Sequence, residues 1–180
     1  MDKINSGNDI RQFLNESSKQ KIMLLIDRVK ENPVLVEDIY SLAIQNEQPY
    51  SWRASWALLH LCKIYPDMLL PFADKIVDDT PKLETGRQIV SFLQILTIID
   101  FPEQDAGHLF DLSISMLHDA KRKMSFKLYA LLFLKKFIKK VPELVPELLL
   151  SIEDEDLISD NKYIRKQIKK LKDDLSNPIK

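Results

Sequence analysis

Glycine is scarce in this sequence, with three residues at positions 7, 86 and 107. Phosphate-cradling loops of the Walker or dinucleotide-binding type need closely spaced glycines, so these nucleotide-binding classes are excluded. Runs of strand length in which apolar and polar residues alternate are also rare, which disfavours a β-sheet. We therefore expect an all-α protein.

Cysteine and metal-binding motifs are equally sparse. Cys62 is the only cysteine, and its place in an apolar helical stretch indicates a buried, inert thiol in a reducing compartment. The histidines at positions 60, 108 and 118 are not spaced as a metal pair, and neither H-E-x-x-H, C-x-x-C nor the G-x-S-x-G elbow occurs. We expect no catalytic residue, no cofactor, no metal site and no enzymatic activity.

Long apolar runs are missing too. The longest, such as LYALLFL, are far shorter than the ~20 residues that a membrane-spanning helix needs. The N-terminal stretch MDKINSGNDIRQ lacks the apolar core of a signal peptide. These features predict a cytoplasmic protein with no membrane partner.

The charges nearly cancel, since 26 Lys and Arg face 27 Asp and Glu for a net charge of −1, and no general attraction to nucleic acid or membrane follows. The C-terminal half is nevertheless segregated. Residues 121–140 hold eight bases and no acid, residues 143–160 seven acids and no base, and residues 162–172 six bases and no acid. Neighbouring blocks could neutralise one another across packed helices, or the two basic blocks could form one positive patch for phosphate backbones.

Prolines divide the chain at regular intervals. Those at positions 33, 66, 102 and 142 each follow an apolar helical run and begin another, and they are 33, 36 and 40 residues apart. Pro49 and Pro81 follow polar turns between them. Proline is favoured at the first helical position, where its missing N–H costs nothing. The prolines thus predict helices over residues 16–31, 33–46, 50–64, 66–79, 83–99, 102–118, 121–140, 142–153 and 160–174.

Helix pairs that recur at this period are typical of a solenoid, in which no single pair can bury its apolar face alone. We predict a single helical repeat domain over residues 1–180. It consists of an N-terminal cap over residues 1–32 and repeats over residues 33–65, 66–101, 102–141 and 142–175.

The second of these repeats resembles a HEAT repeat. In YPDMLLPFADKIVDDTPKLETGRQIVSFLQIL, Pro66 opens a first helix that Pro71 should kink, Asp79 lies at the turn, and Arg87 comes early in the second helix. The fourth repeat, VPELVPELLLSIEDED…YIRKQIKKL, has the same order, with Arg165 at the basic position.

Two other stretches extend or limit the resemblance. SWRASWALLHL is similar to the second helix of a HEAT repeat, with Arg53 at its basic position. The third repeat departs from the pattern, because it has the basic cluster 121–123 after Asp119 but no second proline and no single equivalent of the arginine. Armadillo-like repeats are too similar to separate, and an unrelated helical bundle is the alternative.

The resemblance implies a right-handed α-α superhelix of about four helix pairs, in which second helices line the concave face and the arginines bond turn aspartates of neighbouring units. Helical spacing then places one polar strip per second helix on that face. The candidate binding residues of these strips are Arg53, His60, Arg87, Gln88, Ser91, Lys123, Lys127 and Arg165.

Two functions follow from these features. The first is a non-enzymatic scaffold that binds a protein or peptide partner on the concave face, as solenoids commonly do. The alternative is nucleic-acid binding by a protein related to the HEAT-like alkylpurine DNA glycosylases, for which Trp52 and Trp56 are suitable residue types. The net charge, and the lack of an aspartate among aromatic residues, favour the first function. The oligomeric state is open.

Overall fold

The computed structural model describes residues 6–104, 106–153 and 160–176, and the regular structure in them is entirely helical. The all-α fold predicted from the sequence is confirmed. The chain divides into two compact units, unit 1 (residues 1–101) and unit 2 (residues 102–180). No helix in the described ranges is both long and apolar enough to cross a bilayer.

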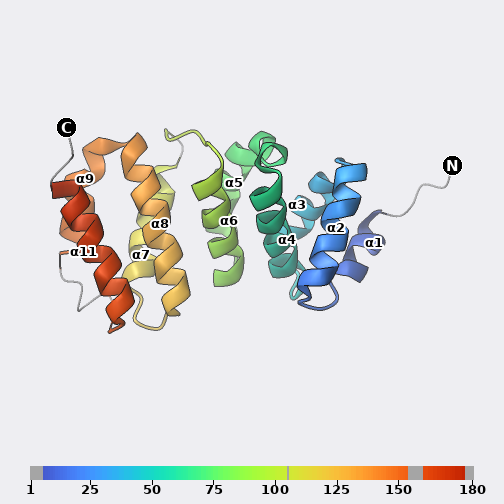
Figure 1. Cartoon of the computed structure of the whole chain (residues 1–180), viewed down its shortest axis with the longest axis horizontal. Helices are drawn as coiled ribbons and strands as arrows, with labels where there is room; N and C mark the ends of the chain where they lie inside the picture. The colour runs from blue at the N-terminus through green and yellow to red at the C-terminus, as the bar shows by residue number, and fades with distance from the viewer. Residues whose placement is uncertain (1–5, 105, 154–159, 177–180) are drawn as a thin grey trace. The chain divides into compact units, whose positions relative to one another are not determined.

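Unit 1 consists of helix pairs in two layers. Its elements are α1 (Ser6–Phe13), α2 (Lys19–Glu31), α3 (Leu35–Ile44), α4 (Tyr50–Ile64), the 3-10 helices η1 (Pro66–Met68) and η2 (Leu70–Phe72), α5 (Ala73–Asp79), η3 (Thr80–Lys82) and α6 (Gly86–Ile98). Figure 1 shows α2, α4 and α6 side by side in one layer, with α1, α3 and α5 behind them.

Helix α4 is the central element of unit 1, because it packs on α2, α3 and α6. Its packed face carries the small buried residues Ser51, Ala54, Ser55 and Ala57, which let the neighbouring helices approach closely. Leu58 is also buried on this face. Burying such a leucine side chain contributes about 2 kcal/mol, so this packing is a main source of stability for the layer.

Tyr40 connects consecutive helix pairs in unit 1. Its ring centroid lies 5.1 Å from that of Phe72 and 5.8 Å from that of Phe92, and its hydroxyl donates a hydrogen bond to Asp79 Oδ2 at 2.9 Å. Burial, and then the hydrogen bond to Asp79, raise the pKa of Tyr40. The hydroxyl therefore remains a protonated donor at neutral pH.

Unit 2 repeats the same two-layer arrangement. Its described elements are α7 (Gly107–His118), α8 (Met124–Lys140), the 3-10 helix η4 (Pro142–Leu144), α9 (Val145–Ser151) and α11 (Lys162–Ser176). Helix α8 packs on both α7 and α11, and the rings of Phe110, Phe133 and Phe137 meet in the core between the layers.

Prolines lie at or near the start of most helices. Pro66 and Pro142 begin η1 and η4, and Pro49 directly precedes α4. Six predicted starts, at positions 16, 33, 83, 102, 121 and 160, are early by two to five residues. For example, α3 begins at Leu35, two residues after Pro33, and α7 begins at Gly107, five residues after position 102. The backbone N–H of Leu35 donates to the Asn32 carbonyl, so a turn precedes α3.

The predicted kink at Pro71 is wrong. Residues 66–72 form two 3-10 helices, and the α-helix of this segment, α5, begins only at Ala73. Pro146 likewise lies in the first turn of α9, directly after η4. In the first turn a missing N–H breaks no intrahelical bond, so both second prolines also mark helix starts.

Polar contacts recur at a separation of about one repeat. Arg11 in α1 forms an ion pair with Glu47, 36 residues later, and Asn46 Nδ2 donates to the Lys82 carbonyl, again 36 residues later. In unit 2, His118 Nε2 donates to the Ser151 carbonyl, 33 residues later. These contacts join equivalent ends of successive helix pairs. The single-domain organisation, the repeat boundaries and the superhelical handedness stay predictions.

Candidate functional site

One stripe of α4 is open to solvent, because α2, α3 and α6 pack on the remainder of its surface. Trp52, Trp56 and His60, four residues apart, occupy this stripe and are all half-buried, and the exposed Lys63 follows them. Residues four apart on a helix lie above one another, so their rings form a row along the helix.

The rings of this row touch. The ring centroids of Trp52 and Trp56 are 6.4 Å apart at 38°, and Trp56 meets His60 edge to face at 5.0 Å and 81°. Such pairs contribute about 0.5–1.5 kcal/mol beyond their burial. The row is therefore a preformed aromatic strip rather than a set of independently mobile side chains.

Two guanidinium groups lie against the first ring. Arg87 Cζ from α6 is 4.5 Å from the Trp52 ring centroid, and Arg53 Cζ is 5.4 Å from it. Both distances are within the range of cation–π attraction. Arg87 is exposed, so its donors face solvent while its planar group covers part of Trp52. We call Trp52, Trp56, His60, Lys63 and Arg87 the aromatic strip.

Arg53 has mainly a structural role. Its Nη1 donates to the Leu14 carbonyl at 2.9 Å, which joins α4 to the end of α1. Its Nε is buried without a hydrogen-bond partner among the described residues. Among the described residues, neither Arg53 nor Arg87 forms the implied bond to a turn aspartate, and Asp79 instead accepts from Tyr40 and Lys82.

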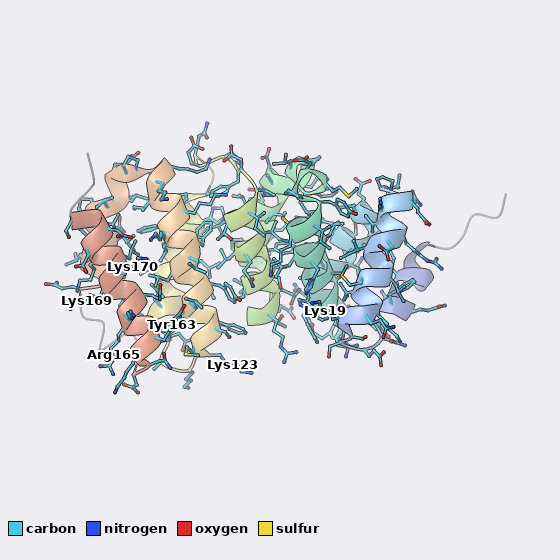
Figure 2. All side chains as sticks on the ribbon, viewed as in Figure 1. Lys19, Lys123, Tyr163, Arg165, Lys169 and Lys170 are labelled. Carbon is cyan, nitrogen blue, oxygen red and sulfur yellow. The ribbon has the colours of Figure 1, made fainter. Side chains whose placement is uncertain are left out.

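His60 is held in its neutral form. Burial lowers its pKa first, and the positive charges of Lys63 and of Lys19, the first residue of α2, lower it further (Figure 2). A neutral imidazole offers one donor and one acceptor at pH 7. His60 thus adds hydrogen-bonding capacity to the strip and leaves its charge to Lys63 and Arg87.

Two predicted binding residues of α6 are buried, so their assignment to an exposed strip is wrong. Gln88 is fully buried and donates through Nε2 to the Ala43 carbonyl at 2.9 Å and to Asn46 Oδ1 at 3.0 Å. It also forms a capping box with Thr85 at the start of α6. Ser91 is 6% exposed, one turn further along α6. The packed face of α6 therefore includes both residues.

The predicted residues of unit 2 separate into buried and exposed ones. Lys127 is 4% exposed, which contradicts its place on an open strip. Burial lowers the pKa of Lys127, while the charges of Asp119 and Asp160 oppose that shift. Lys127 thus occupies the basic position of the second helix in the third repeat, for which the sequence offered no single equivalent of the arginine. Lys123 is exposed, and Arg165 Nη2 donates to the Asp160 carbonyl at 3.0 Å.

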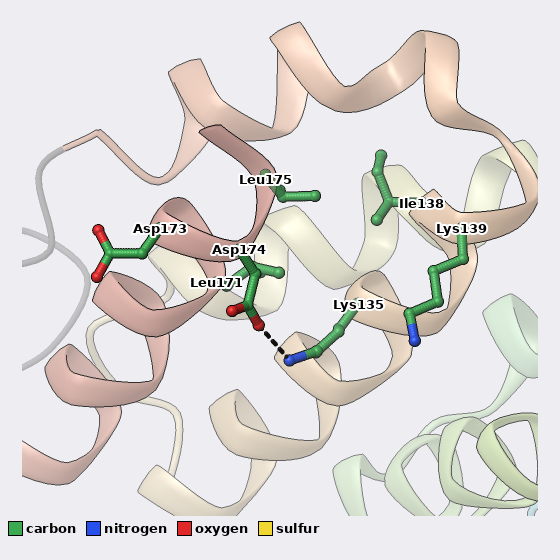
Figure 3. Close-up of a pocket in the computed structure, with 7 residues that line it drawn as sticks. All are labelled: Lys135, Ile138, Lys139, Leu171, Asp173, Asp174 and Leu175. Carbon is green, nitrogen blue, oxygen red and sulfur yellow. Dashed lines mark hydrogen bonds and ion pairs between the residues drawn. The ribbon is translucent and has the colours of Figure 1, made fainter. Parts of the chain in front are cut away.

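A cleft of about 790 Å³ lies between the C-terminal ends of α8 and α11. Ile138, Leu171 and Leu175 line it, and an ion pair of 2.8 Å between Lys135 and Asp174 spans it (Figure 3). The ion pair lowers the pKa of Asp174. Lys139 and Asp173 also line the cleft, so its cations and anions are equal in number and no excess charge selects a ligand. No group of three or more metal-ligating side chains occurs in the described ranges.

Charge distinguishes α4 and α6 from α3 and α5, the helices behind them. Helices α4 and α6 contain no Asp or Glu, whereas α3 and α5 carry five between them. Sequence reasoning placed His60 and Arg87 on an exposed strip but named Trp52 and Trp56 only as residue types suited to the alternative function, so it missed the row of rings. The small residues on the opposite side of α4 could have indicated the exposed side. A helix packs more closely through a side of Ala and Ser than through a side of Trp, so the tryptophans belong on the outer side.

Comparison with known proteins agrees with these observations. No curated protein and no solved structure matches the chain. A family model described as a HEAT repeat domain matches residues 10–172, nearly the whole chain and both units. The chain, a helical repeat scaffold of paired helices, therefore belongs to the HEAT repeat family.

Proposed function

We propose that this scaffold binds an acidic, partly apolar segment of another protein on the aromatic strip of unit 1. The observation that carries the proposal is the half-buried pair Trp52 and Trp56 with the guanidinium of Arg87 against the first ring. Trp and Arg are the residue types that dominate the energetic centres of protein interfaces.

The partner's apolar character follows from the rings. Trp52 and Trp56 leave aromatic surface in contact with water, and covering it releases hydrophobic free energy of about 25 cal/mol per Å². The ring row is already ordered by its contacts along α4, so little conformational entropy is lost on binding. An aliphatic or aromatic side chain of the partner would pack on Trp56.

The partner's acidic character follows from the surrounding charges. Arg87 and Lys63 lie on the strip, Lys19 is near enough to affect His60, and α4 and α6 supply no carboxylate. Arg87 presents a planar guanidinium that can hold a carboxylate through two parallel hydrogen bonds. An acidic segment would therefore gain ion pairs without meeting like charge.

DNA binding of the alkylpurine glycosylase type has less support at this site. Trp52 and Trp56 suit such a site, but it also calls for an aspartate among the aromatic residues, and neither α4 nor α6 has one. Arg53 donates to a backbone carbonyl instead of facing solvent. Only Arg87, Lys63 and Lys19 remain for phosphates, fewer than typical DNA-binding proteins use.

A peptide selection tests the proposal. The full chain is immobilised and screened against a displayed random-peptide library, and bound peptides are sequenced and resynthesised. We expect enrichment of Asp and Glu next to Leu, Phe or Trp. The affinity for these peptides should fall at least tenfold for Trp56→Ala and for Arg87→Glu, a substitution at an exposed residue. Lys30→Glu on α2 is the charge-matched control, and it should retain the wild-type affinity.

Two results would contradict the proposal. Selected peptides could lack acidic residues, which would remove the charge argument. They could also bind Arg87→Glu and Lys30→Glu equally well, which would place the binding surface elsewhere. Circular dichroism of each variant establishes that the helices are retained.

A further inference from the structure

Helix α11 in unit 2 presents a lysine-rich surface that the proposed function does not use. Its buried side consists of Ile164, Ile168 and Leu171. On the opposite side Lys162, Lys166, Lys169 and Lys170 are all exposed, and none of them forms a hydrogen bond or ion pair with a described residue. Arg165 and Lys172 flank this side and donate to the backbone carbonyls of Asp160 and Glu153.

The N-terminal end of α8 extends this surface. Lys123 is exposed directly before α8, and Asp160, just before α11, lies close enough to affect the pKa of Lys127 in the first turn of α8. The two helix starts are therefore neighbours. Figure 2 shows Lys123 beside the start of α8 and Tyr163, Arg165, Lys169 and Lys170 along α11. We call Lys123, Lys162, Lys166, Lys169 and Lys170 the lysine surface.

Few described acids lie near the lysine surface. Helix α8 has no acid, and α11 has acids only at Asp173 and Asp174, where Asp174 is paired with Lys135. Asp119 and Asp160 precede these two helices, and Asp119 is paired with Arg122. The positive charge is thus concentrated at the N-terminal two-thirds of α11. The predicted neutralisation by the acidic block 143–160 falls partly on residues 154–159, which lie outside the described residues.

Tyr163 adds an aromatic ring to this charged surface. It is 54% exposed and lies on the side of α11 that faces α8, next to Lys166 and Lys170 on the helical surface. Exposed aromatic rings among lysines are the combination that single-stranded nucleic acids need, because bases stack on the ring while phosphates meet the ammonium groups.

We propose that the lysine surface and Tyr163 bind single-stranded nucleic acid through its phosphate backbone and one stacked base. The four lysines span residues 162–170 of one helix, about 12 Å, which is comparable with the extent of about four phosphates of one strand. This site lies in unit 2, and its test is independent of the test of the aromatic strip in unit 1.

Other anionic partners fit the same surface less well. Stable attachment to a membrane takes an apolar contribution in addition to basic residues, but Ile164, Ile168 and Leu171 are buried in unit 2. A protein partner would require an apolar centre, and lysine is depleted at such centres. A phosphate backbone needs neither, since its affinity comes from the release of counterions.

The proposal is tested by fluorescence anisotropy of the full chain with a labelled single-stranded DNA of about 20 nucleotides, longer than the sites of known single-strand binding folds. We expect saturable binding at low salt. If four phosphates are neutralised, affinity should fall roughly 50-fold between about 50 mM and 200 mM salt. The substitution Tyr163→Ala should weaken binding roughly fivefold or more, the loss of one stacked base.

Charge-matched variants locate the site. Changing Lys162, Lys166, Lys169 and Lys170 together to Gln should weaken binding at least tenfold, and their exposure means that the fold is retained. The control changes four lysines of unit 1 to Gln, namely Lys21, Lys30, Lys75 and Lys82. Its affinity should stay within about twofold of the wild type, because these lysines lie outside the proposed site.

Three results would overturn the proposal. The first is a flat titration of the wild-type chain at low salt. The second is an equal loss of affinity in the two quadruple variants, which would indicate attraction to the whole protein rather than to α11. The third is binding to vesicles of anionic lipid that the α11 quadruple variant abolishes while the oligonucleotide does not bind.

Discussion

The outer sides of α4 and α11 differ, although each helix is the second of its pair. On α4 the outer side is a row of half-buried rings at Trp52, Trp56 and His60, and on α11 it is a row of exposed lysines around Tyr163. The packed sides of both helices are alike in being largely apolar. The repeat thus constrains the packed positions and leaves the outer positions free to differ in chemistry.

The packed sides also share a basic residue. The fourth residue of α4, α8 and α11 is Arg53, Lys127 and Arg165, respectively. Arg53 donates a hydrogen bond to the Leu14 carbonyl, and Arg165 donates one to the Asp160 carbonyl. The negative charges of Asp119 and Asp160 act on Lys127. At Arg53 this position connects α4 to the end of α1, and at Arg165 it bonds the segment directly before α11. We infer that the position belongs to the repeat rather than to a ligand site.

The largest expected effect concerns Lys127. Replacing it by Ala opens a gap in the packed side of α8, because the Lys127 side chain is buried there. The lost packing should lower the free energy of unfolding of unit 2 by about 2–3 kcal/mol. Urea unfolding followed by far-UV circular dichroism measures the change.

Lys123→Ala is the matched control for this prediction, because Lys123 is exposed and precedes the same helix. It should change the free energy of unfolding by about 0.5 kcal/mol or less. Equal effects of the two substitutions would show that the fourth position of α8 is not structural, and the distinction between packed and outer positions would fail there.

The next largest effect concerns Gln88. Gln88→Ala removes the donor to the Ala43 carbonyl and one half of the capping box with Thr85, which leaves buried backbone groups unpaired. We expect unit 1 to lose about 2 kcal/mol of unfolding free energy. Tryptophan emission reports this transition selectively, since Trp52 and Trp56 are the two tryptophans of the chain.

Gln94→Ala on the same helix is the control for Gln88. Gln94 is only half-buried, so its truncation should cost about 0.5 kcal/mol or less. A loss in Gln94→Ala as large as that in Gln88→Ala would mean that the bonds from Gln88 to the preceding helix pair do not stabilise the stack.

These residues also show how far the sequence determines the fold. The range predicted for α4, residues 50–64, agrees with the structure, because its apolar pattern and the preceding proline both act locally. The continuous helix predicted over residues 66–79 is replaced by two 3-10 helices and α5. Helical periodicity alone could not distinguish a kinked helix that begins at residue 66 from an α-helix that begins only at residue 73, since proline is compatible with both.

The candidate site was harder to predict, because exposure depends on neighbouring helices. Arg87 and Gln88 are adjacent in sequence, yet a rotation of about 100° per residue directs one to solvent and the other to the Ala43 carbonyl, 45 residues away. Lys127 was assigned to the surface from helical spacing, although it is 4% exposed and Asp119 and Asp160 lie near it. Such partners are distant in sequence, so the helical pattern does not reveal them.

A smaller effect tests the charge around the α4 rings without any ligand. The cations of the aromatic strip should attract iodide and repel caesium, so iodide should quench the emission of Trp52 and Trp56 more strongly than caesium does. Arg87→Glu should reduce or reverse this preference, whereas Lys30→Glu should leave it unchanged. Stern–Volmer plots of the three proteins provide the measurement, and equal quenching by both ions would refute the cationic character of the strip.

The smallest effect is a pH dependence from His60. Burial and the charges of Lys63 and Lys19 lower the pKa of His60 in the folded state. As the pH falls, His60 is therefore protonated at a higher pH in the unfolded chain than in the folded one. The free energy of unfolding of unit 1 should therefore decrease as the pH falls below about 6.5, the ordinary pKa of histidine. His60→Gln should reduce this decrease in urea midpoints, and an unchanged pH dependence in that variant would contradict the prediction.

The most direct test of the central proposal uses the two tryptophans as the reporter. Peptides selected on the full chain are titrated into it while the emission of Trp52 and Trp56 is recorded. If the partner covers the aromatic strip, emission should shift to shorter wavelength with saturation at the independently measured affinity, and Arg87→Glu should abolish the shift. Peptides that bind with unchanged tryptophan emission would show that the aromatic strip is not the binding surface.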